Sequence, residues 1–392
     1  MKTVKLKDIS INNRGYYGIG ASAVDYDKNK FTYLRITDIN DDGSLNKNGL
    51  MSVDDEKSDQ YLLEKNDIVF ARTGASTGRN YFYDGEINNM VYAGFLIKFS
   101  LNPELVNPKF VKYYCLSQKY KDWISFSLTG STRPNINEKQ LSEMPIELPD
   151  RFYQDKVVKT LDSIAQKIQL NNETNNNLSE QLKMIFYEWF ESKMDDNLPD
   201  DWKIVDLQDV ATFSQGVQVP IEEQIEQEKD GFVRFIRIVD ITQGSGKEVR
   251  FIEDRDRGHV VENEIFMTRY GTPGILSRNY NGIIANNLFK ITPSDGVTSN
   301  YLFSALNVDR IQKYIKGNAT SSTMPAISFS TLNNQKVIIP DRETIGKFDE
   351  YSETVRKKQL NIINENKRLE RLRDTLLPKL MNGEIDLDNI EI

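Results

Sequence analysis

The chain has 392 residues, of which 50 are Lys or Arg and 58 are Asp or Glu, and its net charge is −8. This length suits two or three domains, and no apolar run approaches the roughly 18 residues that a transmembrane helix needs. The opening "MKTVKLKDIS" lacks the apolar core of a signal peptide, and a single cysteine, Cys115, excludes internal disulfides. Cys115 and the single histidine, His259, cannot supply a four-ligand zinc site. We therefore expect a cytoplasmic protein without membrane or metal.

Residues 1–149 are predicted to form a β-rich domain. Short β-rich runs such as "DIVFAR" (67–72) alternate with turns rich in Gly, Asn and Asp, as is typical of strands joined by tight loops. The stretch "DINDDG" (38–43) begins like a calcium-binding loop, but the twelfth position of that loop is Gly49 instead of Glu. We interpret it as a polar turn.

The period of the apolar residues changes in 150–196, which is predicted to be a long helix. Apolar or Asn residues recur at steps of three and four, the spacing of a coiled-coil seam. That seam consists of Leu161, Ile164, Ile168, Asn171, Asn175, Leu178, Leu182, Ile185 and Trp189. The Asn-rich "NNETNNN" (171–177) leaves one alternative open, a turn that splits the helix in two.

The same order of elements is predicted a second time, with a β-rich domain over 197–340 and a second long helix with a tail over 341–392. Apolar residues of that helix recur at intervals of seven, with one Asn among them. Its seam consists of Val355, Ile362, Asn366, Leu369 and Leu376.

Matching segments show that the second half repeats the first. "FTYLRITDI" (31–39) returns as "VRFIRIVDI" (233–241), "NDIVFARTG" (66–74) as "NEIFMTRYG" (263–271), and "STRPNI" (131–136) as "STMPAI" (322–327). The predicted fold class is therefore α+β, with two β-rich domains alternating with two long helices. Because each helix needs an apolar partner, we expect the two to pair as an antiparallel coiled coil with a pseudo-twofold axis. Duplex DNA read as two half-sites would suit that symmetry.

Three motifs carry a resemblance to a known family. "NDIVFARTGASTG" (66–78), "LPDDWKIVDLQDV" (198–210) and "LLPKLMNGEI" (376–385) together resemble the DNA specificity subunits of type I restriction-modification enzymes. The family's Gly-Asp pair is Asn-Asp at 66–67 and Asn-Glu in the second copy, which changes a turn only. The resemblance covers essentially the whole chain.

The resemblance implies a function and a set of partners. Each β-rich domain would be a target-recognition domain for one half of a bipartite, asymmetric site on double-stranded DNA. The helices would separate the two domains and dock two modification subunits, which methylate adenine with S-adenosylmethionine. Restriction subunits, which use ATP and magnesium, would join them. This chain would be a non-catalytic, cofactor-free subunit in the cytoplasm of a bacterium or archaeon, associated with DNA.

Arginines are the first candidates for DNA contacts, because a guanidinium grips phosphates and recognises guanine edges. Arg35 and Arg237 occupy one repeated position, and Arg72 and Arg269 occupy another. A residue kept in both copies cannot explain why two domains recognise different bases. We expect these four to contact phosphate or to hold the fold, for example through an Arg35–Asp38 pair.

Base recognition is expected where the copies differ. The candidates in the first domain are Arg79 and Arg133, and those in the second domain are Arg250, Arg255, Arg257, Arg278, Asn286 and Asn287. For each of them a solvated loop side chain is the alternative. The tyrosines Tyr16, Tyr17 and Tyr270 could stack on DNA, although packing within the domain is favoured.

Two other classes of function stay open from the sequence. One is a self-contained DNA nuclease or adenine methyltransferase, although "NPKF" (107–110) lacks the second proline of the methyltransferase motif and "GIGASA" (18–23) ends in Ala where a dinucleotide-binding loop has Gly. The other is an interaction protein that binds partner subunits without recognising DNA. Steep salt dependence of DNA binding would distinguish a DNA-recognition subunit from such an interaction protein.

Overall fold

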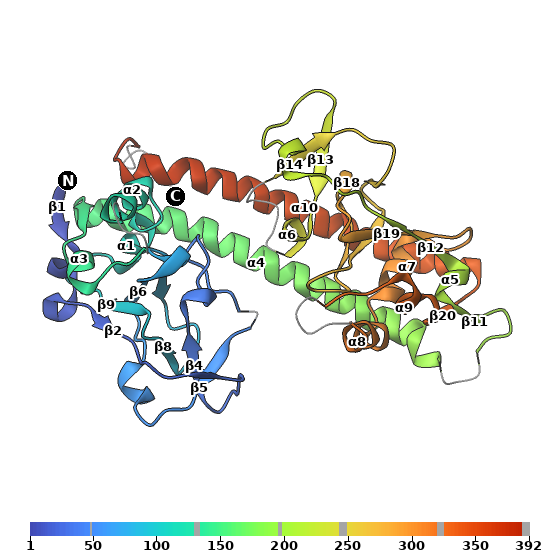
Figure 1. Cartoon of the computed structure of the whole chain (residues 1–392), viewed down its shortest axis with the longest axis horizontal. Coiled ribbons are helices and arrows are strands. Elements are labelled where there is room, and N and C mark those ends of the chain that lie inside the picture. The colour runs from blue at the N-terminus through green and yellow to red at the C-terminus, as the bar shows by residue number, and fades with distance from the viewer. Residues whose placement is uncertain (48, 129–133, 195–197, 243–248, 320–324, 386–392) are drawn as a thin grey trace. The chain divides into compact units, whose positions relative to one another are not determined.

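A computed structural model describes the chain except for residues 48, 129–133, 195–197, 243–248, 320–324 and 386–392 (Figure 1). The chain divides into two compact units. Unit 1 comprises Met1–Gln169 and Lys367–Ile392, and unit 2 comprises Leu170–Asn366. Each unit thus contains one β-rich domain and a part of each long helix. Among the described residues, none of the helices has the length and apolar character to cross a membrane.

The described residues of unit 1 form one two-stranded ribbon and two four-stranded sheets. One sheet has the order β2-β9-β6-β7 and is antiparallel, and the other has the order β3-β5-β4-β8 with β4 and β8 parallel. The ribbon pairs β1 with β10. The strands are β1 (Lys2–Lys5), β2 (Tyr16–Tyr17), β3 (Ala23–Val24), β4 (Phe31–Leu34), β5 (Met51–Val53), β6 (Asp67–Ala71), β7 (Asn80–Tyr83), β8 (Met90–Tyr92), β9 (Leu96–Ser100) and β10 (Pro145–Leu148).

Unit 2 repeats this topology. The order β12-β19-β16-β17 corresponds to β2-β9-β6-β7, and in β14-β13-β18-β15 the parallel pair β13–β18 corresponds to β4–β8. The ribbon pairs β11 with β20. The strands are β11 (Lys203–Asp206), β12 (Ala211–Gln215), β13 (Phe232–Ile236), β14 (Arg250–Glu253), β15 (His259–Val260), β16 (Ile265–Thr268), β17 (Leu276–Ser277), β18 (Gly282–Ile284), β19 (Leu288–Pro293) and β20 (Lys336–Ile339).

Three short α-helices occupy matching places in the described parts of both units, and two further ones in unit 2 stand where unit 1 has 3₁₀ turns, Leu6–Ile9 and Ile36–Asp38. In unit 1 they follow β9 and precede β10, and several begin at an Asn or Ser whose side chain caps a free backbone N–H. The helices are α1 (Pro108–Tyr114), α2 (Gln118–Ser127) and α3 (Glu138–Ser142) in unit 1, and α5 (Leu207–Val210), α6 (Ile238–Thr242), α7 (Ser299–Leu306), α8 (Asp309–Gly317) and α9 (Phe329–Asn333) in unit 2.

Strand β6 explains the layers of unit 1, because it is buried along its whole length. Its alternate residues enter two different cores. Ile68 and Phe70 pack in the core that includes α1, whereas Val69 and Ala71 pack in the core shared with β4 and β8. The antiparallel sheet therefore lies between a helical layer and the second sheet, which is why "IVFA" (68–71) is continuously apolar.

The two long helices are α4 (Arg151–Trp189) and α10 (Arg342–Met381). The "NNETNNN" stretch is helical, so the alternative of a turn there is wrong. Within unit 2 the helices run antiparallel, because Asn171 contacts Asn366 while Phe186 contacts Phe348. In unit 1, Tyr153 near the start of α4 donates a hydrogen bond to the Leu380 carbonyl near the end of α10, at 3.1 Å.

The predicted seams are buried or half-buried, with one exception. Leu161, Ile164, Asn171, Leu182, Val355 and Asn366 are buried, and Ile168, Asn175, Leu178, Ile185, Ile362, Leu369 and Leu376 are half-buried. Trp189 is exposed, and Phe186 and Phe190 take the core positions in this part of α4. A spacing of three or four residues allows either Ile185 and Trp189 or Phe186 and Phe190 to face the core. The aromatic cluster with Tyr301 and Phe348 buries the two phenylalanines.

Candidate nucleic-acid interface

The two β-rich domains form equivalent backbone hydrogen bonds around strands β2 and β12. We call this shared set of bonds the backbone frame. Gly18 N–H donates to Leu96 O at 3.2 Å in unit 1, and Gly216 N–H donates to Leu288 O at 3.1 Å in unit 2. A Cβ added at either glycine would lie 2.3 Å from a carbonyl oxygen of the neighbouring strand. Only glycine fits there, so these positions are structurally equivalent.

The residues on either side follow the same register. Gly94 N–H donates to Ile19 O at 2.7 Å, and Asn286 N–H donates to Val217 O at 2.8 Å. This makes Gly94 equivalent to Asn286. The next position gives the same result, because Arg72 N–H donates to Phe95 O and Arg269 N–H donates to Asn287 O, at 3.0 and 2.9 Å.

The repeated Pro-x-Ile segments fix the loops that carry Arg72 and Arg269. Ile136 N–H donates to Arg72 O at 2.9 Å, and Ile327 N–H donates to Arg269 O at 3.1 Å. Pro134 O and Pro325 O accept from Gly74 and Gly271, two glycines whose φ is positive. The repeated motif therefore holds a loop at the end of β6 and of β16.

In unit 1 the surface on this frame is aromatic and cationic. A cavity of about 520 Å³ is lined by Arg14, Tyr16, Tyr17, Lys98 and other residues. The Arg14 and Arg72 guanidinium carbons lie 4.6 and 4.9 Å from the ring centres of Tyr16 and Tyr17. Stacked arginines of this kind present positive charge beside a flat apolar face, a combination found on protein surfaces that bind nucleic acids.

In unit 2 the corresponding surface carries amide side chains beside an arginine. A cavity of about 720 Å³ is lined by Gln215, Gln218 and Arg257, among others. Gln215 Nε2 donates to the Asn286 carbonyl at 3.0 Å, and Asn286 Nδ2 donates to Gln218 Oε1 at 3.3 Å. Both glutamines and Arg257 are exposed. Amide and guanidinium groups are those that recognise adenine and guanine edges.

Comparison with known proteins decides the family. A family model described as the type I restriction modification DNA specificity domain matches residues 1–180 and again residues 199–366. The chain belongs to this family. The resemblance in the three sequence motifs is thereby confirmed, and so is a fold of two β-rich regions alternating with two long helices.

Individual specificity subunits are similar over most of the chain. The HindI specificity subunit of Haemophilus influenzae is 23% identical over 403 residues, which cover 82% of this chain and 87% of the relative. The MjaIX specificity subunit of Methanocaldococcus jannaschii is 23% identical over 300 residues, covering 71% and 69%. The crystal structure of a type I S subunit from M. genitalium has the same fold, with a TM-score of 0.55 and 17% identity over 97% of this chain and 95% of that one.

The arginines at repeated positions of this specificity subunit contact residues of their own domains. Arg35 binds Asp38 with two guanidinium hydrogen bonds of 3.0 and 2.7 Å, and its backbone N–H also donates to that carboxylate. Arg237 repeats the backbone contact to Asp240 at 2.8 Å. Both aspartates are buried. This geometry supports a fold-holding role for the Arg35 and Arg237 positions. Arg72 stacks on Tyr17, and Arg269 stacks on Tyr270 and donates to Ile327 O.

The predicted base-reading arginines have diverse surroundings. Arg79 pairs with Asp41, Arg250 with Glu226 and Arg255 with Glu223. For the exposed Arg257, no ion pair is found within the part of the chain that the structure describes. Arg133 lies outside the described residues. A guanidinium already held by a carboxylate must exchange that partner before it can bind DNA.

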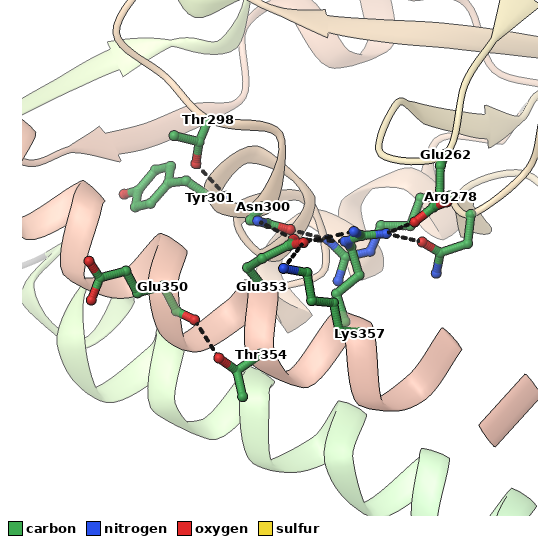
Figure 2. Close-up of polar contacts among 11 residues, drawn as sticks. Glu262, Arg278, Thr298, Asn300, Tyr301, Glu350, Glu353, Thr354 and Lys357 are labelled. Atoms are coloured by element: carbon green, nitrogen blue, oxygen red, sulfur yellow. Dashed lines mark hydrogen bonds and ion pairs between the residues drawn. The ribbon is translucent and has the colours of Figure 1, made fainter. Parts of the chain in front are cut away.

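Arg278 is the candidate whose position argues most strongly against a DNA contact. Its exposure is only 6%, and it stacks at 4.1 Å on the Phe303 ring. Its Nη1 donates to Asn300 Oδ1 at 2.7 Å, and Asn300 Nδ2 donates to Glu353 on α10 at 3.2 Å (Figure 2). Burial, and then repulsion from Arg356, lower the pKa of Arg278 to about 10. Nothing in the sequence indicates this burial, because the basic context of Arg278 is the same as that of the loop arginines.

Gln215 and Gln218 are candidate binding residues that sequence reasoning missed. The repeat alignment did not include β2 and β12, where "YYGIG" (16–20) and "SQGVQ" (214–218) share only one glycine. A usable signal lies in the paired strands, since "YAGFLIK" (92–98) and "IANNLFK" (284–290) share Ala, Leu and Lys at the same spacing. Extending the repeat through these segments would have revealed the aligned amides.

Proposed function

We propose that this chain is the DNA-recognition subunit of a type I restriction-modification complex. In this proposal the target-recognition domains, residues 1–149 and 197–340, each recognise one half of a bipartite, asymmetric site. The observation that carries the proposal is a single backbone frame used twice, with tyrosines and cations on one copy and glutamines and an arginine on the other. The family match over both copies supports it.

The proposal assigns chemistry to partner subunits. Two modification subunits would hold S-adenosylmethionine and methylate adenine, and restriction subunits would use ATP and magnesium. The contribution of this chain would be recognition, with α4 and α10 separating the domains and docking the partners. The complex would act on double-stranded DNA in the cytoplasm.

Mapping adenine methylation across the source genome tests the function, with the gene present and with the gene deleted. We expect deletion to remove methylation from one asymmetric motif made of two half-sites, and complementation to restore it. A methylation map that is unchanged by the deletion, in a cell whose modification subunit is expressed, contradicts the proposal.

DNA binding by the assembled complex provides an independent test. Arginine and lysine contacts to phosphates release counterions, so affinity should fall by about 10³-fold or more between about 50 and 200 mM salt. Binding that does not change with salt, or that does not depend on the sequence, favours an interaction protein instead.

A further inference from the structure

We propose that Gln215, Gln218 and Asn286 form the base-recognition cluster of the second domain and that it selects for adenine. The inference rests on the proposed function and deepens it by naming the residues and the base. It concerns unit 2 alone.

Four positions on the shared frame differ in chemistry between the units. Gly18 is equivalent to Gly216, so Tyr17 in unit 1 corresponds to Gln215 in unit 2, and Gly20 corresponds to Gln218. The backbone bonds from Gly94 and Asn286 make these two residues equivalent, and Phe95 corresponds to Asn287. Positions that carry Tyr, Gly, Gly and Phe in one copy therefore carry Gln, Gln, Asn and Asn in the other.

Such a replacement cannot be required by the fold. The backbone hydrogen bonds at these positions are the same in both units, so the amides are not needed to form the strands. Gln215 and Gln218 are exposed, so they contribute little to a core. Side chains that change in chemistry on an unchanged frame are expected where two domains must select different ligands.

The contacts among the amides preorganise the cluster. Gln215 binds the Asn286 carbonyl, and Asn286 in turn donates its side-chain amide to Gln218 Oε1. Gln218 Oε1 is oriented by this bond, and its Nε2 keeps two donors. Adenine presents an N7 acceptor beside an N6 donor in the major groove, the pattern that one Asn or Gln side chain matches with two hydrogen bonds. Arg257, which lines the same cavity, supplies a cation for a nearby phosphate or guanine.

The test compares sequence preference for the wild-type chain and three variants, each assembled with its modification subunits. Gln218→Ala removes the amide, Gln218→Glu keeps the shape but loses both N–H donors, and Asn334→Ala is the control, an exposed amide at the end of α9. Duplexes that carry every single base-pair change in the methylated motif are used to measure binding and methylation. Thermal unfolding of each complex checks that the fold is kept.

We expect Gln218→Ala and Gln218→Glu to lower discrimination at one adenine position of one half-site about five- to 150-fold, the range that one bidentate contact provides. The other half-site should keep its full discrimination, and Asn334→Ala should match the wild type. Unchanged discrimination in both Gln218 variants, or equal losses in both half-sites, overturns the inference and leaves the proposed function standing. A wild-type complex without any sequence preference overturns the proposed function and this inference together.

Discussion

Lys109 Nζ on α1 lies 2.9 Å from Asp162 Oδ2 on α4, and this ion pair has a counterpart of different charge in unit 2. Lys109 is the second residue of α1 and Asn300 the second of α7, while Asp162 and Glu353 lie equally far along their helices (162 minus 151, and 353 minus 342). Asn300 binds Glu353 at 3.2 Å. Both recognition domains are thus fastened to a long helix at the same place.

A third residue joins each of these contacts, and its charge is opposite in the two units. Asp84 directly follows β7 and lies 3.1 Å from Lys109, whereas Arg278 directly follows β17 and donates to Asn300 at 2.7 Å. The order is carboxylate, ammonium and carboxylate in unit 1, and guanidinium, amide and carboxylate in unit 2. The charges in each group of three therefore complement one another. Exchanging one residue for its counterpart in the other unit leaves a charge without a partner.

A substitution in unit 1 tests this matching. Lys109→Asn should lower the free energy of unfolding by about 1–3 kcal/mol, because Asp84 and Asp162 then lose their shared partner. Adding Asp84→Arg recreates the arrangement of unit 2 and should recover part of the loss. Urea unfolding of the full chain measures both values. If Asp84→Arg instead lowers the stability of Lys109→Asn further, the unit 2 arrangement does not stabilise unit 1 and the proposed matching is wrong.

The ion pair between Glu353 and Arg356 predicts a pH dependence. Two guanidinium hydrogen bonds of 2.7 and 2.8 Å from the buried Arg356 hold the pKa of Glu353 down at about 2. Since the folded state lowers this pKa, the stabilisation is present above the ordinary pKa of Glu and is lost as the pH falls toward 2. Wild type should exceed Glu353→Gln in stability near neutral pH and lose that advantage during acid titration. A constant difference down to about pH 2 would contradict the assignment.

The paired glycines allow a sharper test of the backbone frame. Gly18→Ala places a methyl group 2.3 Å from a carbonyl oxygen, whereas Gly20→Ala meets nothing within 4 Å and has no positive φ. We expect Gly18→Ala to cost about 1–3 kcal/mol of stability and Gly20→Ala to cost almost none. Thermal unfolding compares the two. Because Gly216 is equivalent, Gly216→Ala should repeat the loss in unit 2, and tolerance there would refute the equivalence.

Features that repeat along the chain or recur with a helical period could be predicted from the sequence. Heptads predicted both long helices, because an apolar stripe must be buried whatever else the fold does. The repeat alignment matched Arg72 with Arg269, and their loops are held by the same bonds. The carboxylates that neutralise Arg79 and Arg250 come from distant loops, and only tertiary structure places Asp41 and Glu226 beside them. The same limit applies to Arg278, whose burial depends on α7 and α10.

The asparagines at the helix seam give the last prediction. Asn171 donates its amide to Asn366 Oδ1 at 2.8 Å, and Asn366 donates to Asn172 Oδ1 at 2.8 Å, while Asn175 O accepts from Gln359. Replacing only Asn366 with Leu removes one of the two acceptors of the buried Asn171 amide, which keeps Glu365 Oε2 at 2.8 Å, and should cost about 1 kcal/mol. Replacing both Asn171 and Asn366 with Leu should instead raise stability, since leucines pack well at a seam, while weakening the selection of helix register.

Urea unfolding of the full chain measures the stability of these variants, and cysteine cross-linking across the helices in unit 2 measures their register. Asn175→Leu is the control, because Gln359 meets its backbone carbonyl and the substitution keeps that acceptor. If the double variant is as unstable as Asn366→Leu, the asparagines stabilise the helix pair directly. If its cross-links keep the wild-type register, the phenylalanine cluster around Phe186 and Phe348 sets the register instead.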